Sequence, residues 1–322
     1  MSADDGVNSD TFLADNDNSN TRIGFNLRKT LHNGDTLHFR FETAVGLRGS
    51  SGTTPTDNNF TVAVRSTDLR HFSFTYASER FGEISVCQGS TATDGVAEID
   101  LSGTDIAAYS SLSDIGGGVA FRTVAGAQSA VSVGDVFGNF DGSRRFRLRY
   151  DTPTFNGFSA AVSYGQEVLN SGDSNDYYDA AIRYNKTLGD FTIASGLGYS
   201  DRDTGNERAI GSVSVRHNPT GLNGTLAACQ SLGGDEEYIF AKIGVIRDWF
   251  DFGSTALSVE YYDGSDFASV GSSSQAYSVS AVQKIDRYNL ELYATYRTYE
   301  FSDATTTYQD VNAAFVGARF KF

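Results

Sequence analysis

Apolar and polar residues alternate along most of this chain with a period of two. Successive side chains of a strand point to opposite faces, so this period predicts strands with one apolar and one polar face. The stretch 21–28 shows the pattern, and an Asn33-Gly34 pair, typical of tight hairpins, separates it from a matching stretch at 37–45. The last residues repeat the alternation, and the chain ends on the aromatic ring of Phe322.

Two kinds of connector join these stretches. Short turns such as 187–190 alternate with longer polar segments such as 263–274, an asymmetry typical of outer-membrane barrels. No apolar run reaches the roughly 18 to 20 residues of a spanning helix. We therefore expect an all-β fold, a transmembrane antiparallel β-barrel with lipid outside and a wet lumen inside. A soluble β-sandwich is the alternative, but it gives no reason for the asymmetry.

The alternation predicts about fifteen strands, whereas single-chain bacterial barrels have an even number. We expect a barrel of the 16-stranded type whose first strand is missing from this chain, with that strand and a signal peptide lying upstream. Residues 1–322 are then a single domain. Residues 1–19 are acidic and rich in Asn, and they are interpreted as the remnant of an extracellular loop.

Composition and charge narrow the possible partners. The chain has 34 Gly, 23 Phe and 17 Tyr but only 3 Pro, and its net charge of −15 argues against nucleic acid. Acidic residues concentrate in the expected loops, where calcium binding is possible, although such a run is more often a solvated surface. Cys87 and Cys229 are expected to stay unbridged, and no Cys or His spacing indicates a metal site.

One connector is far longer than the others. Residues 90–141 form an insert with both apolar and acidic residues, and a loop of this length is usually functional or disordered. Its apolar content predicts that it packs against another part of the protein. Five of its acids are the candidates for a charged constriction: Asp94, Glu98, Asp100, Asp105 and Asp114.

An arginine-rich strand follows this insert. If Phe146 and Leu148 face lipid, then Arg145, Arg147 and Arg149 face inward, because Arg at the bilayer midplane costs roughly 2 to 4 kcal/mol. Arg22 and Arg40 share the inward parity on the first hairpin. An acidic loop opposite this basic wall would place a transverse field across a narrow pore and tune which solutes pass. Alternatively, these arginines only solvate the lumen or form salt bridges.

Several segments resemble Gram-negative general porins, particularly those of alphaproteobacterial type. They are the hairpin start 21–25, the strand and loop segments 81–95 and 98–104, and the terminus 320–322. The resemblance implies a homotrimer of 16-stranded barrels with 90–141 folded into each lumen as the constriction loop. It also implies that the acids named above face the five arginines. Phe320 and Phe322 are then expected to act as the membrane-insertion signal.

The resulting hypothesis is a water-filled outer-membrane pore for passive diffusion of small hydrophilic solutes and ions. Its expected partners are outer-membrane lipid and lipopolysaccharide, the barrel-assembly machinery and other copies of the chain, with no cofactor. A substrate-specific channel for a sugar or an anion, or a surface receptor or adhesin on the same barrel, remains the alternative. An enzyme is not expected, since the four His are scattered and no Gly-x-Ser-x-Gly nucleophile motif occurs.

Overall fold

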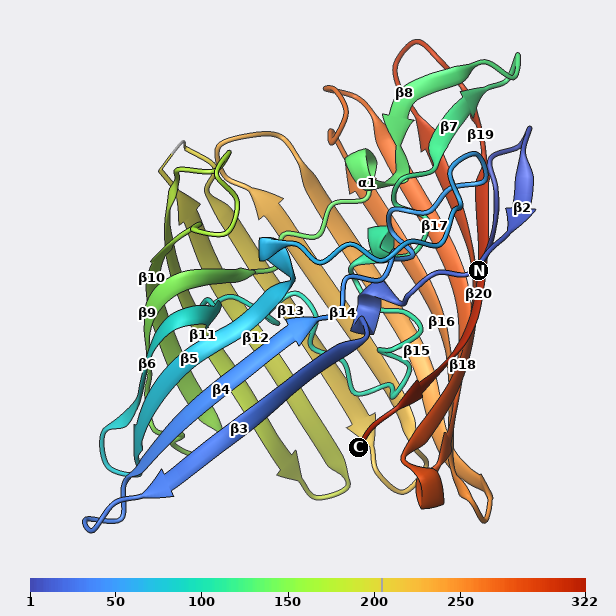
Figure 1. Cartoon of the computed structure of the whole chain (residues 1–322). Coiled ribbons are helices and arrows are strands. Elements are labelled where there is room, and N and C mark those ends of the chain that lie inside the picture. The colour runs from blue at the N-terminus through green and yellow to red at the C-terminus, as the bar shows by residue number, and fades with distance from the viewer. Residues whose placement is uncertain (204) are drawn as a thin grey trace.

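The computed structural model describes residues 1–203 and 205–322, and it contains one large antiparallel sheet that curves around a lumen (Figure 1). Fifteen strands of 8 to 14 residues make up the wall, which suits tilted membrane-spanning strands. Their bounds are β3 (Arg22–Thr30), β4 (Thr36–Ala44), β5 (Leu69–Ser78), β6 (Gly82–Ser90), β9 (Arg144–Asp151), β10 (Phe158–Gln166), β11 (Asp176–Leu188), β12 (Phe191–Arg202), β13 (Arg208–His217), β14 (Leu222–Ser231), β15 (Glu237–Phe250), β16 (Gly253–Ser265), β17 (Ser273–Ile285), β18 (Leu290–Ser302) and β20 (Val311–Phe320).

The remaining elements are short and lie in the connectors. The strands are β1 (Ser2–Asp4), β2 (Ser9–Thr11), β7 (Ala120–Thr123), β8 (Gln128–Ser132) and β19 (Tyr308–Gln309). The helices are η1 (Asp17–Ser19), η2 (Ser66–Asp68), η3 (Leu112–Asp114), α1 (Val133–Val136) and η4 (Asp286–Tyr288). None of these helices has the length and apolar composition needed to cross a membrane.

The wall strands turn their apolar side chains outward, as the alternation predicts. Ile23 and Leu27 on β3 are 57% and 60% exposed, and Ile243 on β15 is 67% exposed. Small polar side chains point inward, and Ser258, Ser280 and similar residues of β16–β18 are buried. Such an outward apolar surface is stable in lipid rather than in water. The predicted all-β barrel fold is confirmed.

Each wall strand pairs with its neighbours in sequence, and β6 pairs with β9 across the long insert. The insert therefore spans residues 91–143 and will be called the constriction loop. At the start of the chain, residues 2–4 form β1, which pairs with the Asn312–Ala314 end of β20 and with β2. Within residues 1–203 and 205–322, no strand ladder pairs with the second edge of β3 or extends along the rest of β20.

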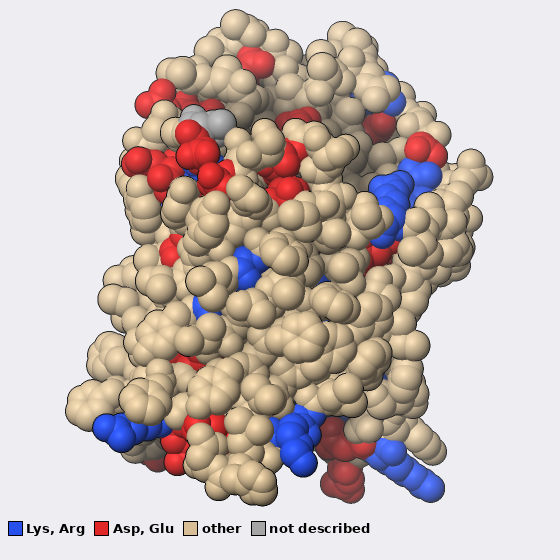
Figure 2. Space-filling view, turned by 60° about the vertical axis from the view of Figure 1, so that its left-hand side comes forward, with Lys and Arg blue, Asp and Glu red and all other residues tan. Residues whose placement is uncertain are grey.

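Charge is unevenly distributed over the outside of the molecule. Acidic side chains gather at the end that carries the long loops, and a mostly uncharged band separates them from charges at the short-turn end (Figure 2). Outer-membrane barrels place their short turns in the periplasm and their long loops outside the cell. By this rule the short-turn end is expected to face the periplasm.

The compact apolar core lies inside the barrel rather than between layers. Constriction-loop residues such as Val96, Ile115 and Phe137 are buried against inward side chains of β15–β18, including Tyr262 and Tyr299. The prediction that this loop enters the lumen is confirmed. Because it fills the β10–β18 side, open space remains between the loop and strands β3–β6 and β9.

Candidate functional site

The root of the constriction loop is held by wall arginines. Arg149 donates to the Thr91 carbonyl at 2.7 Å, and Arg183 donates to the carbonyls of Ala92 and Asp94 at 2.8 and 2.9 Å. Arg147 donates to the Ser90 carbonyl at 3.1 Å. The charged guanidinium groups donate hydrogen bonds to backbone carbonyls where the chain leaves the β6–β9 ladder. The positions of these arginines thus determine where the loop enters the lumen.

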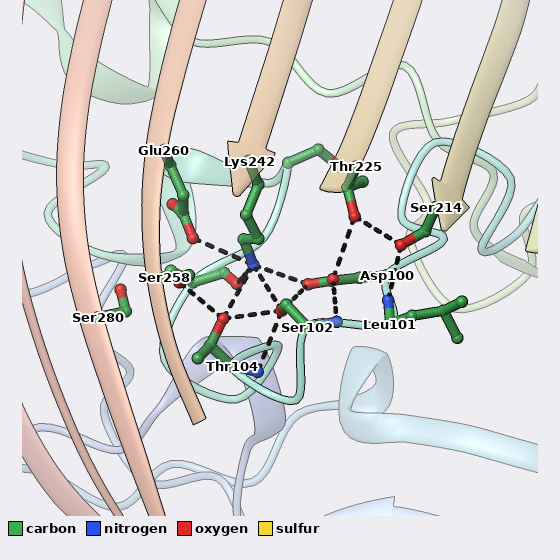
Figure 3. Close-up of polar contacts among 12 residues, drawn as sticks. Asp100, Leu101, Ser102, Thr104, Ser214, Thr225, Lys242, Ser258, Glu260 and Ser280 are labelled. Carbon is green, nitrogen blue, oxygen red and sulfur yellow. Dashed lines mark hydrogen bonds and ion pairs between the residues drawn. The ribbon is translucent and has the colours of Figure 1, made fainter. Parts of the chain in front are cut away.

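The middle of the loop is fastened by a buried ionic network, the latch, formed by Asp100, Lys242, Glu260 and Arg297. Figure 3 shows Lys242 between Asp100 and Glu260. The Lys242 ammonium on β15 lies 2.7 Å from Asp100 and 3.1 Å from Glu260, and its side chain is fully buried. Arg297 on β18 lies 3.2 Å from Glu260. Two cations and two anions balance, as buried charges require.

The latch also bonds the loop backbone. Lys242 donates to the Ala108 carbonyl at 2.6 Å, and Arg297 donates to the Leu112 carbonyl at 3.0 Å. The two cations therefore hold both ends of the segment 108–112. This segment carries Tyr109 and lies between Asp105 and Asp114, so the latch positions the side chains that face the open lumen.

Beside this segment lies a cavity of about 460 Å³ in the lumen, which we call the eyelet. Its acids come from the constriction loop and from the N-terminal segment, and its bases come from β3, β5 and the start of β9. The acids are Asp17, Asp94, Glu98, Asp105, Asp114 and Asp141, and the bases are Arg22, Arg70 and Arg144.

The basic side of the eyelet is organised around one carboxylate, Glu42. Arg70 lies 2.7 Å from it, Arg40 lies 2.8 Å from it and Arg22 lies 3.6 Å from it. Three arginines thus share a single partner. This wall keeps a net positive charge, which faces the acids of the loop across the eyelet.

Burial changes the protonation of the loop acids. It raises the pKa of Asp141 to about 7, with the charge of Asp94 adding to the effect, and it raises the pKa of Asp114 to about 6. The pKa of Glu98 is raised well above its ordinary value by burial and by the nearby charge of Asp141. The negative charge of the eyelet consequently depends on pH in the neutral range.

The structure brings together only part of the constriction predicted from sequence. Asp94, Glu98, Asp105 and Asp114 line the eyelet, together with Arg22. Asp100 does not line it, because it is bound to Lys242 on the opposite side of the loop.

The other four predicted arginines lie outside the eyelet. Arg40, Arg147 and Arg149 line a separate cavity nearer the short turns. Arg145 points toward the long-loop end, where it lies 3.3 Å from Glu167 and stacks over Tyr177. The prediction that the β9 arginines face the lumen is thus correct. They lie at different depths along it, however, and do not form one constriction.

Sequence reasoning missed several eyelet residues for local reasons. Arg70 shares the parity of the outward Phe72, but a register irregularity opposite Thr43 turns it inward. Arg144 is the first residue of β9 and directly follows the constriction loop, so the alternation of the strand does not fix its face. Asp17 lies in the N-terminal segment, and its carboxylate accepts a hydrogen bond from the backbone N–H of Ser51. Only Asp141, an acid at the end of the expected loop 90–141, had a signal in the sequence.

No metal site is found, and the cysteines are unbridged. Within the described residues, no group of three or more His, Cys, Asp or Glu side chains is arranged to hold a metal ion. Calcium binding therefore stays a prediction. Cys87 and Cys229 are both free, as expected. Cys87 has a φ of 73°, a conformation that favours glycine.

Comparison with known proteins supports this architecture. The anion-selective porin of Comamonas acidovorans aligns with a TM-score of 0.62 and 18% identity over 100% of this chain and 96% of its own. Salmonella typhi OmpF aligns at 0.55 and 11% identity, covering 92% and 89%. OmpT of Vibrio cholerae aligns at 0.54 and 12% identity, covering 93% and 88%. At these identities the likeness concerns the fold.

The sequence itself identifies the family. No curated protein matches the chain. The profile described as Gram-negative porin, however, matches residues 2–304, which is nearly the whole sequence. With a barrel wall, a loop inside the lumen and a charged eyelet, the chain belongs to the Gram-negative porin family, the outer-membrane channels for passive diffusion.

Proposed function

We propose that this porin is a general diffusion channel that prefers cations. The observation that carries the proposal is the composition of the eyelet, where six acidic side chains oppose three arginines, with burial shifting the ionisation of Glu98, Asp114 and Asp141 to higher pH. Two of those arginines, Arg22 and Arg70, already share Glu42. Fixed charges at a constriction raise the local concentration of the opposite ion. Small hydrophilic solutes pass by size and charge, without a chemical step, and we propose no catalytic activity.

Reversal potentials across a planar bilayer with a KCl gradient test this preference. A potential of the sign set by K⁺ is expected, and an Asp94→Asn/Asp105→Asn variant should move it toward zero. A matched variant, Asp235→Asn/Glu236→Gln, removes two acids of the β14–β15 connector outside the eyelet and should change the reversal potential little. A wild-type potential of the sign set by Cl⁻ would contradict the proposal and favour an anion channel.

We also propose that the channel assembles as a homotrimer. One solved neighbour, V. cholerae OmpT, is described in a trimer form. In this chain the outward faces of β3–β5 carry a continuous aromatic surface with ring centroids 4.7 to 6.0 Å apart. Its residues are Phe25, Phe39, Phe41, Phe72 and Phe74. Native mass spectrometry of the refolded protein should show three copies, and a monomer alone would count against the assembly.

The remaining partners follow from the proposed location. Outer-membrane lipid and lipopolysaccharide would surround the wall, and the barrel-assembly machinery would recognise the terminal Phe320 and Phe322. Deletion of Phe322 should lower the amount of folded barrel in cells, whereas refolding in detergent should be less affected. Equal losses in both settings would argue against a role in recognition.

A further inference from the structure

Below the eyelet, toward the short turns, lies a second and larger cavity of about 760 Å³, which we call the lower vestibule. It is bounded by β3–β6 and β9, and it opens near the turns that include Gly34 and Glu79. Its deep end carries His71, Arg147 and Ser90, close to the root of the constriction loop. The lower vestibule therefore lies on the short-turn side of the eyelet, and the two cavities share no lining residue.

The charges of the lower vestibule differ from those of the eyelet. Four arginines and two histidines line it, against three carboxylates. The basic residues are Arg28, His38, Arg40, His71, Arg147 and Arg149, and the acids are Glu79, Glu83 and Asp151. The acids Glu79 and Glu83 lie at or beside the turn, whereas Arg147 lies at the deep end.

Two of these four arginines have carboxylate partners, and a third, Arg28, is exposed on β3. Arg149 is held by Asp151 through contacts of 2.6 and 2.8 Å, and Arg40 is held by Glu42 at 2.8 Å. Arg147 is different. In the part of the chain that the structure describes, no carboxylate lies within 4.0 Å of it, and its Nε and Nη1 atoms donate only to the Ser90 and Cys87 carbonyls.

The second nitrogen of the Arg147 guanidinium faces a gap left by Gly89. A methyl group at Gly89 would lie 2.7 Å from Arg147 Nη2 and 3.3 Å from His71 Nδ1. The two nitrogens are thus at most 6.0 Å apart, since both distances are measured from the same point. Both side chains are only 7% exposed, and among the described residues neither Nη2 nor the imidazole has a hydrogen-bond partner.

A buried guanidinium without a countercharge is costly unless an anion completes it. An oxyanion with oxygens about 2.8 Å from each donor can bridge two nitrogens at this spacing. We propose that Arg147 and His71, with Gly89 leaving the space between them, form an oxyanion-binding station in the lower vestibule. It would take the carboxylate, phosphate or sulfate group of a small solute. The acidic eyelet and this basic station would then act in sequence on solutes that carry both charges.

Block of the pore by sulfate tests the station, using the complete refolded protein in a planar bilayer. Sulfate is added to each side of the same channel in turn while KCl carries the current. We expect block at a lower concentration from the short-turn side, because sulfate reaches the station from there without crossing the acidic eyelet. Phosphate and acetate, compared in the same way, distinguish dianions from carboxylates as preferred ligands.

Arg147→Gln should raise the half-blocking concentration at least about tenfold, since a charged hydrogen bond contributes roughly 1.5 to 3 kcal/mol. The matched control is Arg183→Gln. Arg183 also donates to carbonyls of the loop root, at 2.8 and 2.9 Å, but does not line the lower vestibule. Arg183→Gln should loosen the loop root, but sulfate should still block at a lower concentration from the short-turn side.

Two further variants keep the test informative if Arg147→Gln folds poorly. Gly89→Ala fills the gap and His71→Gln alters the second donor, and each should weaken the block from the short-turn side. Equal block from both sides, or equal losses in Arg147→Gln and Arg183→Gln, would overturn the proposal. The station does not depend on the cation preference of the eyelet, which the reversal potential measures separately.

Discussion

At the scale of single residues, this pore depends on charges placed where water is scarce. Burial raises the pKa values of Asp114 to about 6 and of Asp141 to about 7, so both acids titrate close to neutral pH. Lys242 stays in the interior because Asp100 and Glu260 balance it. Asp114 and Asp141 can change charge while the loop remains in place. Lys242 and its two carboxylate partners hold the loop.

The raised acids predict a pH-dependent selectivity. Both groups are protonated below their pKa values, so the eyelet is least negative near pH 5, and ionisation of Asp114 and then Asp141 should increase cation preference up to about pH 8. One unit charge about 5 Å from a passing ion contributes roughly 0.8 kcal/mol in water, or about a fourfold change in the permeability ratio. Reversal potentials measured across this pH range check the rise.

Two variants locate the source of that rise. Asp141→Asn should flatten the upper part of the profile. Asp303→Asn should not, since hydrogen bonds from Thr305 and Tyr308 lower the pKa of Asp303 to about 2 and keep it charged throughout. A wild-type profile without slope between pH 5 and 8 would show that these acids do not control the ion flow.

The latch makes a prediction about stability. Lys242→Met should leave Asp100 without its buried countercharge and Glu260 with Arg297 alone, at a cost of about 3 to 5 kcal/mol. Thermal unfolding of the refolded barrel should therefore occur at lower temperature, and single channels should show noisier currents as the loop loosens. Lys284→Met, at a solvent-exposed site on β17, is the control. The double variant Lys242→Met/Asp100→Asn should recover part of the lost stability, because it leaves fewer unpaired charges.

At the scale of the elements, β9 shows how one strand serves two solvents. Phe146 and Leu148 point outward and are 50% and 55% exposed, whereas Arg147 between them is buried in the lumen. A strand separates its faces in this way because successive side chains alternate. The constriction loop begins where this alternation ends, and the arginines of β9 and β11 hold its root.

Leu148→Arg tests the assignment of the outward face. Arg at the lipid midplane costs roughly 2 to 4 kcal/mol, so the variant should give less folded barrel in lipid vesicles. The comparison is Thr75→Arg, which places the same side chain on the inward face of β5 in the lower vestibule. Heat-modifiable migration on gels measures the folded fraction. Equal folding of the two variants would mean that the Leu148 face does not meet lipid.

At the scale of the whole molecule, the loop divides the lumen into a packed half and an open half. Its apolar residues cover the inner face of β15–β18, and the open cavities lie along β3–β6 and β9. The eyelet lies above the lower vestibule, with an excess of acids in the first and of bases in the second. The order of these two regions arises only when the loop is in place.

Thiol labelling tests this division. In a Cys87→Ser/Cys229→Ala background, Asp105→Cys should react with a water-soluble thiol reagent and lower the single-channel conductance, because residue 105 lines the eyelet. Asp100→Cys should react much more slowly, because Asp100 is enclosed in the latch. Similar reaction rates at both positions would contradict the placement of the loop.

Much of the architecture could be predicted from the sequence because it follows from local periodicity. The alternation around Phe25, Leu148 and Phe320 determined strands, faces and the barrel class, and the length and composition of 90–141 marked the loop that enters the lumen. These properties depend on neighbouring residues along one strand. They can therefore be inferred without knowing which strands meet.

The constellation of charges was decided only by the tertiary structure. Asp100 and Asp105 look alike in the sequence, yet one is buried against Lys242 from a strand more than a hundred residues away and the other faces the eyelet. Arg70 reaches the eyelet through a register irregularity that reverses its expected face. Long-range pairing determines which charge each side chain meets, and an alternating pattern contains no information about that choice.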